Sequence, residues 1–453
     1  MSQGKYISKT GFGRALFSLF VHRTLYIVHR VPSPHRGEGK GEGGTKYEIR
    51  NTRYEFRSVI LTLIQFLLCF LFFLPLISEA QSFSPIIRIK ILEGKESITA
   101  GATGSFQIES EGRKILSYPS STSPQRIEVT SSGIKIAGIL WGKQIWIKPK
   151  ESDSLSLVNG RRYRGSLLIK QKEDFLEVIN ELPLEEYLYG VMEGEIPSSW
   201  PFDVLCAQAI AARTYALEEI ERLERLAEEQ DYHLSWTTED QVYGGVESET
   251  RQARQAVDDT RGKVITYQGE LIKAFYHNCC GGHTVSSGDV WGGEDFPYLK
   301  VGPDEFCKES PYYKWEWEIE VSELRKILVK EGFSVGKIYR LQVLSRTEDL
   351  SFEEGGRVAK LRIYYKEGYQ DLTGTEFRKL IRRWVGKYLL KSTLFKVGRW
   401  VKREASYFRF EGRGSGHGVG MCQWGAKKMA EEGRNFQDIL QFYYPGTEIE
   451  KRY

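Results

Sequence analysis

Carboxylates gather just before a proline in the stretch Leu182–Leu217, which is apolar and rich in aromatic residues. Glu193 and Glu195 lie two residues apart, and Pro197 favours extended backbone at the residue before it, so one element should end near Glu195. If this segment is extended, the two carboxylates share a face and raise each other's pKa. A carboxyl group held in this way suits general acid catalysis. The alternative is a carboxylate that only caps the following helix.

The residues after Pro197 are predicted to form that helix. Ser198 and Ser199 offer capping side chains, and Pro201 suits a first helical position. Apolar and small residues then recur at helical spacing: Phe202, Leu205, Cys206, Ala209, Ala212 and Ala216. Small residues let a helix pack closely, so a carboxylate just ahead of it can be both buried and fixed.

A second group of reactive residues follows a predicted strand. His277, Cys280 and His283 are spaced three residues apart, and Cys307 lies further on. Two imidazoles and two thiols suit tetrahedral zinc. Cys279 points away from Cys280 in an extended segment, so one of the two is expected to be left out. A Cys280–Cys307 disulfide and a nucleophilic Cys–His pair are the alternatives.

A third candidate is Gly412–Trp424, in which glycines alternate around His417. Glycine allows a ligand to approach the backbone closely. The loop is neither a dinucleotide-binding turn nor a P-loop, because no Lys follows in register and no parallel βαβ unit surrounds it. One interpretation is a polysaccharide held by His417, Gln423 and Trp424; the other is a tight turn with a capping histidine.

Composition is that of a globular protein, with 41% hydrophobic and 27% charged residues. The aromatic share of 13% suits either carbohydrate stacking or core packing. The net charge of +4 arises in residues 1–57, which hold eleven Lys or Arg and four Glu, so the rest of the chain is slightly acidic. We therefore expect no nucleic-acid partner.

Two N-terminal segments precede the globular part. Residues 1–57 are low-complexity and charged, which predicts disorder or an extension from a misplaced start codon. Residues 58–80 contain the apolar run Val59–Ile77, with arginines before it and Ser78-Glu79-Ala80 after it, which suits signal peptidase. A cleaved signal peptide and a retained anchor both remain open. In either case the body is exported to the periplasm or cell wall and meets the membrane only through this segment.

The elements that must position these residues predict an α+β fold. Residues 81–180 alternate in the manner of strands and form a β-rich N-terminal part. A central helical catalytic segment lies in a core made of residues 181–310 and 401–453, which ends with the Gly-rich loop and a helix. Residues 311–400 form a mixed α+β insertion, with helices near 321–331 and 376–390.

Three stretches in this order resemble the SpoIID/LytB family: LPLEEYLYGVMEGEIPSSWPFDVLCAQAIAARTYA, AFYHNCCGGHT and GSGHGVGMCQWGAKKMA. The resemblance covers roughly residues 86–453. It implies a peptidoglycan-active protein outside the cytoplasmic membrane. Sporulation members are lytic transglycosylases of glycan stripped of stem peptides, and their catalytic glutamate in an E-[MI]-P step corresponds to Glu195. The LytB branch implies the alternative of a non-enzymatic enhancer of an N-acetylmuramoyl-L-alanine amidase, and a wall-binding scaffold is a third reading.

The resemblance also implies a mechanism and further site residues. The muramyl 6-hydroxyl attacks its own anomeric carbon, so one glutamate can act as acid and then base, and the product is a 1,6-anhydromuramyl end. Some members hold structural zinc through Cys and His in the corresponding loop, which here implies the ligands His277, Cys280, His283 and Cys307. The expected substrate contacts are Arg213, His417 and Gln423, with His283 as a further candidate. The family typically has Ser where this chain has Cys422.

Overall fold

The computed structural model describes residues 84–110, 115–228, 230–237, 240–386, 389–402 and 405–453. The low-complexity extension and the export segment predicted for residues 1–57 and 58–80 lie outside the described residues. Within the described ranges, no helix combines the length and the apolar character needed to cross a membrane. All described elements belong to one structural unit, Ser82–Tyr453.

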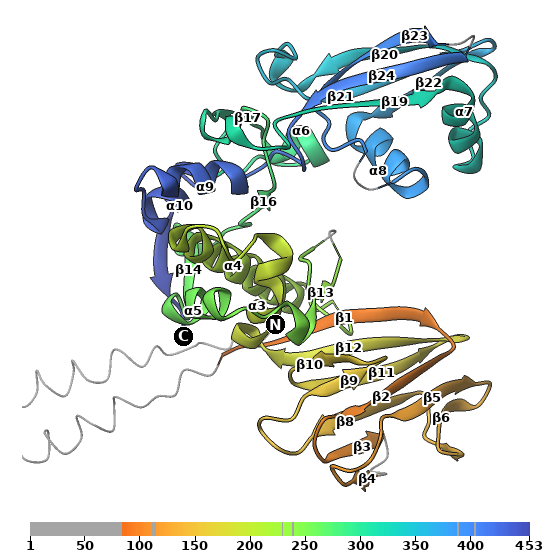
Figure 1. Cartoon of the computed structure of the whole chain (residues 1–453), viewed down its shortest axis with the longest axis vertical. Helices are drawn as coiled ribbons and strands as arrows, with labels where there is room; N and C mark the ends of the chain where they lie inside the picture. Colours follow the sequence, from red (N-terminus) through yellow and green to blue (C-terminus); the bar gives the residue numbers. More distant parts are fainter. Residues whose placement is uncertain (1–83, 111–114, 229, 238–239, 387–388, 403–404) are drawn as a thin grey trace, which may run out of the picture. The chain divides into compact units, whose positions relative to one another are not determined.

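Two β-sheets form the β-rich N-terminal part that the sequence predicts (Figure 1). Alternate residues of their strands turn inward, so that Ile87 and Ile89 are fully buried. The seven-stranded sheet has the order β13 (Leu234–Ser235), β1 (Ile86–Lys95), β12 (Phe175–Pro183), β11 (Ser166–Lys172), β8 (Gln144–Pro149), β3 (Phe106–Ser110) and β4 (Ile115–Tyr118). The six-stranded sheet has the order β10 (Arg161–Tyr163), β9 (Ser156–Val158), β2 (Ser97–Ala102), β5 (Gln125–Thr130), β6 (Gly133–Ile136) and β7 (Ile139–Leu140).

Helix α3 (Leu184–Glu195) follows β12 directly, and Glu195 is its last residue. Ile196 is extended, with φ −140° and ψ 146°, so the element ends where Pro197 predicts. The segment before it is helical, however, and not extended. Residues two apart on a helix point in very different directions, so Glu193 does not share a face with Glu195.

Helix α4 (Phe202–Leu226) begins after Pro201, which caps it without a side-chain hydrogen bond. The capping role predicted for Ser198 and Ser199 is therefore wrong. The Glu193 carboxylate instead accepts a hydrogen bond of 2.9 Å from the backbone N–H of Ser198, which fixes the turn between the two helices. The small-residue face of α4 is buried as predicted, with Ala209 and Ala212 fully inaccessible.

Short strand pairs join distant parts of the core made of residues 181–310 and 401–453. Strand β16 (Tyr276–His277) runs parallel to β25 (Met421–Cys422), which sets His277 beside Cys422. The other core elements are η1 (Gly245–Ser248), α5 (Arg251–Asp259), β14 (Lys263–Tyr267), β15 (Glu270–Leu271), β17 (His283–Thr284), α6 (Ser287–Trp291), β18 (Gly302–Pro303), η2 (Phe306–Glu309), α9 (Gln423–Glu431), α10 (Phe436–Tyr443) and β26 (Glu448–Lys451).

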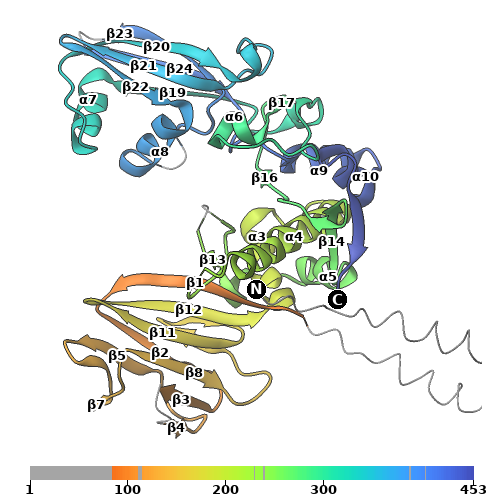
Figure 2. The same ribbon diagram turned by 180° about the vertical axis from the view of Figure 1, so that it is seen from behind.

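The insertion has a hydrophobic core of its own, and its two helices lie on one side of its sheets (Figures 1 and 2). Its elements are β19 (Lys314–Glu320), α7 (Val321–Lys330), β20 (Ile338–Arg346), η3 (Thr347–Asp349), β21 (Val358–Tyr365), β22 (Gly368–Thr373), α8 (Gly374–Trp384), β23 (Phe395–Lys402) and β24 (Ala405–Arg413). Phe408 and Phe410 of β24 are buried in this second core. The predicted boundary at residue 400 therefore cuts a hairpin that belongs to the insertion.

Candidate functional site

Glu195 lines a cavity of about 730 Å³. The core of residues 181–310 and 401–453 supplies most of the wall: Gly194, Glu195, Tyr215, Asp240, Gln241, Val242, Phe275, Tyr276, His277, Asn278, Trp291, Ser415, Gly416, His417 and Gln423. Tyr312, Arg378, Arg382 and Lys391 supply the remainder. Segments almost 230 residues apart in sequence thus meet around one carboxylate.

Three donors hold the Glu195 carboxylate. The backbone N–H of Val242 donates to Oε1 over 2.8 Å, and the side chains of Gln423 and Tyr276 also form hydrogen bonds with it. Burial raises the pKa of Glu195 to about 7, and the three hydrogen bonds oppose that rise only in part. A carboxyl group with a pKa near neutrality can deliver a proton and take one back at physiological pH.

The pKa of Glu195 leads to a prediction about pH. A general acid works only while protonated, so kcat/KM should fall as the pH rises through about 7. Replacing Val242 by Pro removes the N–H donor to the carboxylate, which raises the pKa of Glu195 further. The fall in kcat/KM should then occur at a higher pH. Rates measured between pH 5 and 9 test this. A profile that is flat across that range would contradict the role of Glu195 as the acid.

A chain of hydrogen bonds between hydroxyl and amide groups leads to the Glu195 carboxylate. The Tyr187 hydroxyl donates to Gln241 over 3.0 Å, and the Gln241 amide donates to the Tyr276 hydroxyl over 3.0 Å. Burial raises the pKa of Tyr187 and Tyr276 well above its usual value, so both stay protonated and able to donate. Gln241 and Tyr276 carry no local sequence signal, because their role depends on a contact across the cavity.

Two histidines of the cavity wall are neutral. Burial lowers the pKa of His277 to about 3, and it lowers that of His417 well below its ordinary value. His417 uses both ring nitrogens, with Nε2 2.9 Å from the carbonyl of Tyr276 and Nδ1 3.1 Å from the N–H of Val419. His277 bonds the Val419 carbonyl through Nδ1, and its buried Nε2 has no partner among the described residues. Nε2 of His277 is therefore an acceptor that faces no protein donor.

Aromatic rings add a flat surface to the same cavity. Phe275 and Trp291 have ring centroids 4.8 Å apart, and Trp291 lies 5.0 Å from the His417 ring. Trp291 is 47% exposed. Trp424, which the sequence suggested as a glycan contact, packs against Trp200 instead and is not part of the cavity wall. Of these two tryptophans, only Trp291 lines the cavity.

A second carboxylate, Asp240, lines the same cavity. It accepts hydrogen bonds from the Ser235 N–H at 2.8 Å and from the Tyr215 hydroxyl at 3.4 Å. Glycosidases with two carboxylates use one as acid and the other as base or nucleophile. The mechanism expected from the sequence uses a single acid. Asp240 supplies a second carboxylate in the same cavity, and its replacement tests whether the reaction needs it.

Arg213, a predicted substrate contact, lies outside the cavity wall. It is fully buried on α4 and forms a two-point ion pair with Glu185, with Nε and Nη2 each 2.8 Å from a carboxylate oxygen. It also donates to the backbone carbonyls of Val257 and Lys263. A guanidinium held on all sides by protein cannot reach a glycan, so this prediction is corrected: Arg213 is structural.

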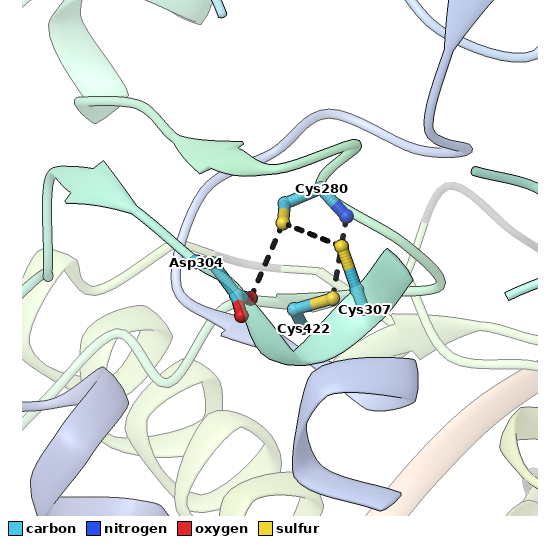
Figure 3. Close-up of side chains that lie close together, drawn as sticks. All are labelled: Cys280, Asp304, Cys307 and Cys422. Atoms are coloured by element: carbon cyan, nitrogen blue, oxygen red, sulfur yellow. Dashed lines mark hydrogen bonds between the residues drawn. The ribbon is translucent and has the colours of Figure 1, made fainter. Parts of the chain in front are cut away.

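The predicted zinc set is only half assembled. Cys280 and Cys307 meet, with Sγ atoms 3.3 Å apart, but the atoms grouped with them come from Asp304 and Cys422 (Figure 3). His277 turns to Val419, and His283 lies 4.0 Å from Glu348 of the insertion. The two imidazoles are therefore not in the cluster. All of its thiols are buried and no imidazole is grouped with them, an arrangement that does not favour the nucleophilic Cys–His alternative.

Comparisons with known proteins match two parts of the chain to family models. The family model described as Stage II sporulation protein (SpoIID) matches residues 172–267, and a domain of unknown function, DUF8618, matches residues 304–420. An uncharacterized protein of Brachyspira hyodysenteriae is 32% identical over 375 residues, which cover 80% of this chain and 92% of that protein. Stage II sporulation protein D of Bacillus subtilis is 32% identical over 285 residues, 60% of this chain and 75% of that protein.

The amidase enhancer of Bacillus subtilis is 30% identical over 393 residues, which cover 77% of this chain. The chain spans about half of that relative, 53% of its length. The matched segments hold α3 with Glu195, and the insertion together with the first half of the Gly-rich loop. The chain belongs to the SpoIID/LytB family.

Proposed function

We propose that this protein is an exported lytic transglycosylase of the cell wall, which cleaves the bond between N-acetylmuramic acid and N-acetylglucosamine in peptide-stripped glycan. The observation that carries the proposal is the Glu195 carboxyl group, with its pKa raised to about 7, in the wall of a large cavity. Protonated Glu195 would donate its proton to the glycosidic oxygen. The ionised form would then accept the proton of the muramyl 6-hydroxyl as that oxygen closes the 1,6-anhydro ring.

The neutral side chains of the cavity suit a sugar. Trp291 and Phe275 offer aromatic faces on which the apolar side of a pyranose ring can pack. Nε2 of His277 can accept a hydroxyl hydrogen bond, since it has no partner among the described residues. Gln423 remains a predicted substrate contact from its place in the wall, while its bond to Glu195 also orients the acid.

Cations from the insertion suit the charge of the substrate. Arg378, Arg382 and Lys391 line the cavity, and burial together with the nearby Arg382 lowers the pKa of Arg378 to about 9. Positive charge concentrated in this way attracts an anion. N-acetylmuramic acid carries a lactyl ether whose carboxylate is free only after the stem peptide has been removed. We propose that Arg382 and Lys391 bind that carboxylate and so favour stripped glycan.

This charge pairing predicts a change in affinity. Arg382→Gln and Lys391→Gln should each raise KM for stripped glycan about tenfold, the loss of one charge-assisted contact, with kcat nearly unchanged. Lys396→Gln is the matched control, because Lys396 is exposed on β23 and lies outside the cavity wall. Equal KM values for all three variants would refute the assignment.

Product analysis tests the proposed reaction. The full chain is incubated with peptide-free glycan, and the new ends are analysed by mass spectrometry. Anhydromuramyl ends, each lighter by one water than a reducing end, are expected. Reducing ends alone would mean that water is the nucleophile, and Asp240, which lines the cavity, would then be the carboxylate to test as the base.

The similarity to the amidase enhancer, which covers 77% of this chain, favours a second candidate function: stimulation of a cell-wall amidase without catalysis. This function does not depend on the carboxyl group of Glu195. An amidase assay with wild type and Glu195→Gln separates the two proposals. Equal stimulation by both proteins, with no glycan cleavage by either, would favour the enhancer.

A further inference from the structure

Three tyrosines lie in a row on the outer face of the insertion sheet made of β20, β21 and β22. Tyr364 and Tyr369 stand directly opposite each other on β21 and β22, and their ring centroids are 6.4 Å apart. The ring of Tyr339 on β20 lies 6.1 Å from that of Tyr364. Ile363, the neighbour of Tyr364, points the other way and is buried in the second core. Tyr339 and Tyr369 are 48% and 54% exposed, so the sheet presents a row of aromatic rings to solvent.

A bulge in β20 brings Tyr339 to this face. Ile338 pairs with Tyr365 and Arg340 pairs with Tyr364, so Tyr339 is an extra residue between two pairs. In a regular strand, neighbouring side chains point to opposite faces, and Tyr339 and Arg340 could not both lie on the outer one. The bulge leaves both side chains exposed. A local irregularity of the strand therefore completes the row.

Two guanidinium groups lie against these rings. Arg362 is 3.8 Å from the ring centroid of Tyr369, and Arg340 is 5.6 Å from that of Tyr364. Asp371 offsets the charge of Arg362, because it accepts two hydrogen bonds from that guanidinium, of 2.7 and 3.0 Å. Arg340 forms no ion pair with a carboxylate among the described residues. The exposed charge of Arg340 is therefore available to an anion that lies on the row.

The net charge of the insertion also favours an anionic partner. Residues 311–413 hold 23 Lys or Arg and 14 Asp or Glu, whereas residues 181–310 hold 10 and 26. An excess of positive charge attracts and orients anions. The row consists of rings and a cation, while the centre of a protein–protein interface is usually apolar and poor in charge. An acidic polysaccharide fits better, because its sugar rings can pack on tyrosine and its carboxylates can pair with arginine.

We propose that Tyr339, Tyr364 and Tyr369, together with Arg340, form a second binding surface for peptide-stripped glycan. All four residues lie outside the wall of the cavity that holds Glu195. The choice of this polysaccharide rests on the proposed function, because the free lactyl carboxylates of that substrate are the anions that Arg340 would bind. A polymer bound at two places stays at a high effective concentration near each of them. The surface would thus hold the enzyme on its insoluble substrate between cleavages.

Co-sedimentation of the full chain with insoluble peptide-stripped glycan tests this surface. All proteins carry Glu195→Gln, so that the polymer stays intact. Tyr369→Ala and Arg340→Gln should each raise the Kd about fivefold, the loss of one stacking or one charge-assisted contact. Tyr369→Phe keeps the ring and should bind as the parent protein does. Both positions are exposed, so the variants should fold.

Trp384→Ala and Lys326→Gln are the matched controls. Trp384 is 42% exposed on α8 and Lys326 is exposed on α7, the two helices that cover the other side of the insertion (Figure 1). Neither change should alter the Kd. If the variants of the row bind as tightly as the parent protein, or if the controls weaken binding as much as they do, the proposal is wrong.

Competition identifies the chemistry that the row recognises. Chitin oligosaccharides lack the lactyl carboxylate, so their binding should depend on Tyr369 and not on Arg340. Polyphosphate carries charge without sugar rings, and it should displace the glycan only weakly. If polyphosphate bound more tightly than the glycan, the surface would be a site for phosphate polymers, and the assignment to glycan would be overturned.

Cleavage kinetics with Glu195 intact separate this surface from the cavity. Tyr369→Ala should raise the KM for insoluble glycan about fivefold and the KM for a short soluble fragment far less, because a short fragment does not reach the row. An equal rise for both substrates would place Tyr369 in the cleavage site and contradict the proposal. If the wild type binds glycan through Tyr369 but cleaves none, the proposed function fails and the second surface stands.

Discussion

Glu195→Gln is expected to lower the rate of glycan cleavage by about 10²–10⁴-fold, because the amide cannot donate the proton that the leaving sugar oxygen needs. The substitution keeps size and shape. The Val242 N–H that donates to Oε1 in the wild type can donate to the amide oxygen of the variant. The measurement is the initial rate of formation of new glycan ends, followed at the pH optimum of the wild type.

The stability of Glu195→Gln serves as its control. Burial raises the pKa of Glu195 to about 7 in the folded chain, above its unfolded value near 4.5, so ionisation opposes folding. The wild type therefore loses stability as the pH rises from about 4.5 through 7, and the variant does not. Glu195→Gln should match the Tm of the wild type at pH 4 and exceed it at pH 8. If the variant were less stable than the wild type at both pH values, its loss of activity would reflect unfolding and not the loss of the acid.

Asp240→Asn shows whether one carboxylate suffices. If the substrate supplies its own nucleophile, this variant should keep most of the activity and still form anhydromuramyl ends. The Ser235 N–H can donate to the amide oxygen, and the Tyr215 hydroxyl can accept from the amide nitrogen that replaces the other oxygen, so the fold should persist. A loss of activity as large as that of Glu195→Gln would contradict the single-acid mechanism.

Breaking the ion pair between Glu185 and Arg213 is expected to cost about 3–5 kcal/mol of folding free energy. Both side chains are at most 1% exposed, and removing either would leave a buried charge without its partner. Glu185 Oε1 also accepts from the Gly262 N–H and from the Tyr453 hydroxyl, so this pair joins α3, α4 and the C-terminus. Denaturant unfolding of Arg213→Ala and Glu185→Gln gives the measurement.

Arg225→Ala is the matched control for that prediction. Arg225 lies on the same helix, is 57% exposed and meets Glu218 at 3.5 Å, so its loss should cost less than about 1 kcal/mol. Replacing Arg213 and Glu185 together by Met and Leu should be milder than either single change, because no charge then remains unpaired. Single variants of Arg213 that cost no more than Arg225→Ala would show that the pair is not structural.

Local sequence signals predicted the elements well. Apolar alternation gave the strands of the N-terminal part, and the Pro197 rule placed the end of an element at Glu195. Signals of this kind act between neighbouring residues, so they can be read along the chain. The extended conformation considered for the residues around Glu193 and Glu195 is not adopted, because Leu184–Glu195 forms a helix.

The site was predicted less completely, for a physical reason. Glu195, His417 and Gln423 were found from motifs, and each lines the cavity. Gln241 and Tyr276 carry no local signal, since their function arises only when segments from far along the chain meet. Arg213 was misplaced because a charged residue on an apolar helix face has the same sequence signature whether it meets a substrate or a buried Glu185.

The sequence places one glutamate on each side of Gly194, and either of them could act as an acid. By itself the sequence determined that a glutamate ends an element there and that a close-packing helix follows. Only the tertiary structure separated the two glutamates: the helix turns Glu193 to the Ser198 N–H at the surface and Glu195 into the cavity. Burial then raises the pKa of Glu195, and burial is a property of the whole fold rather than of any segment.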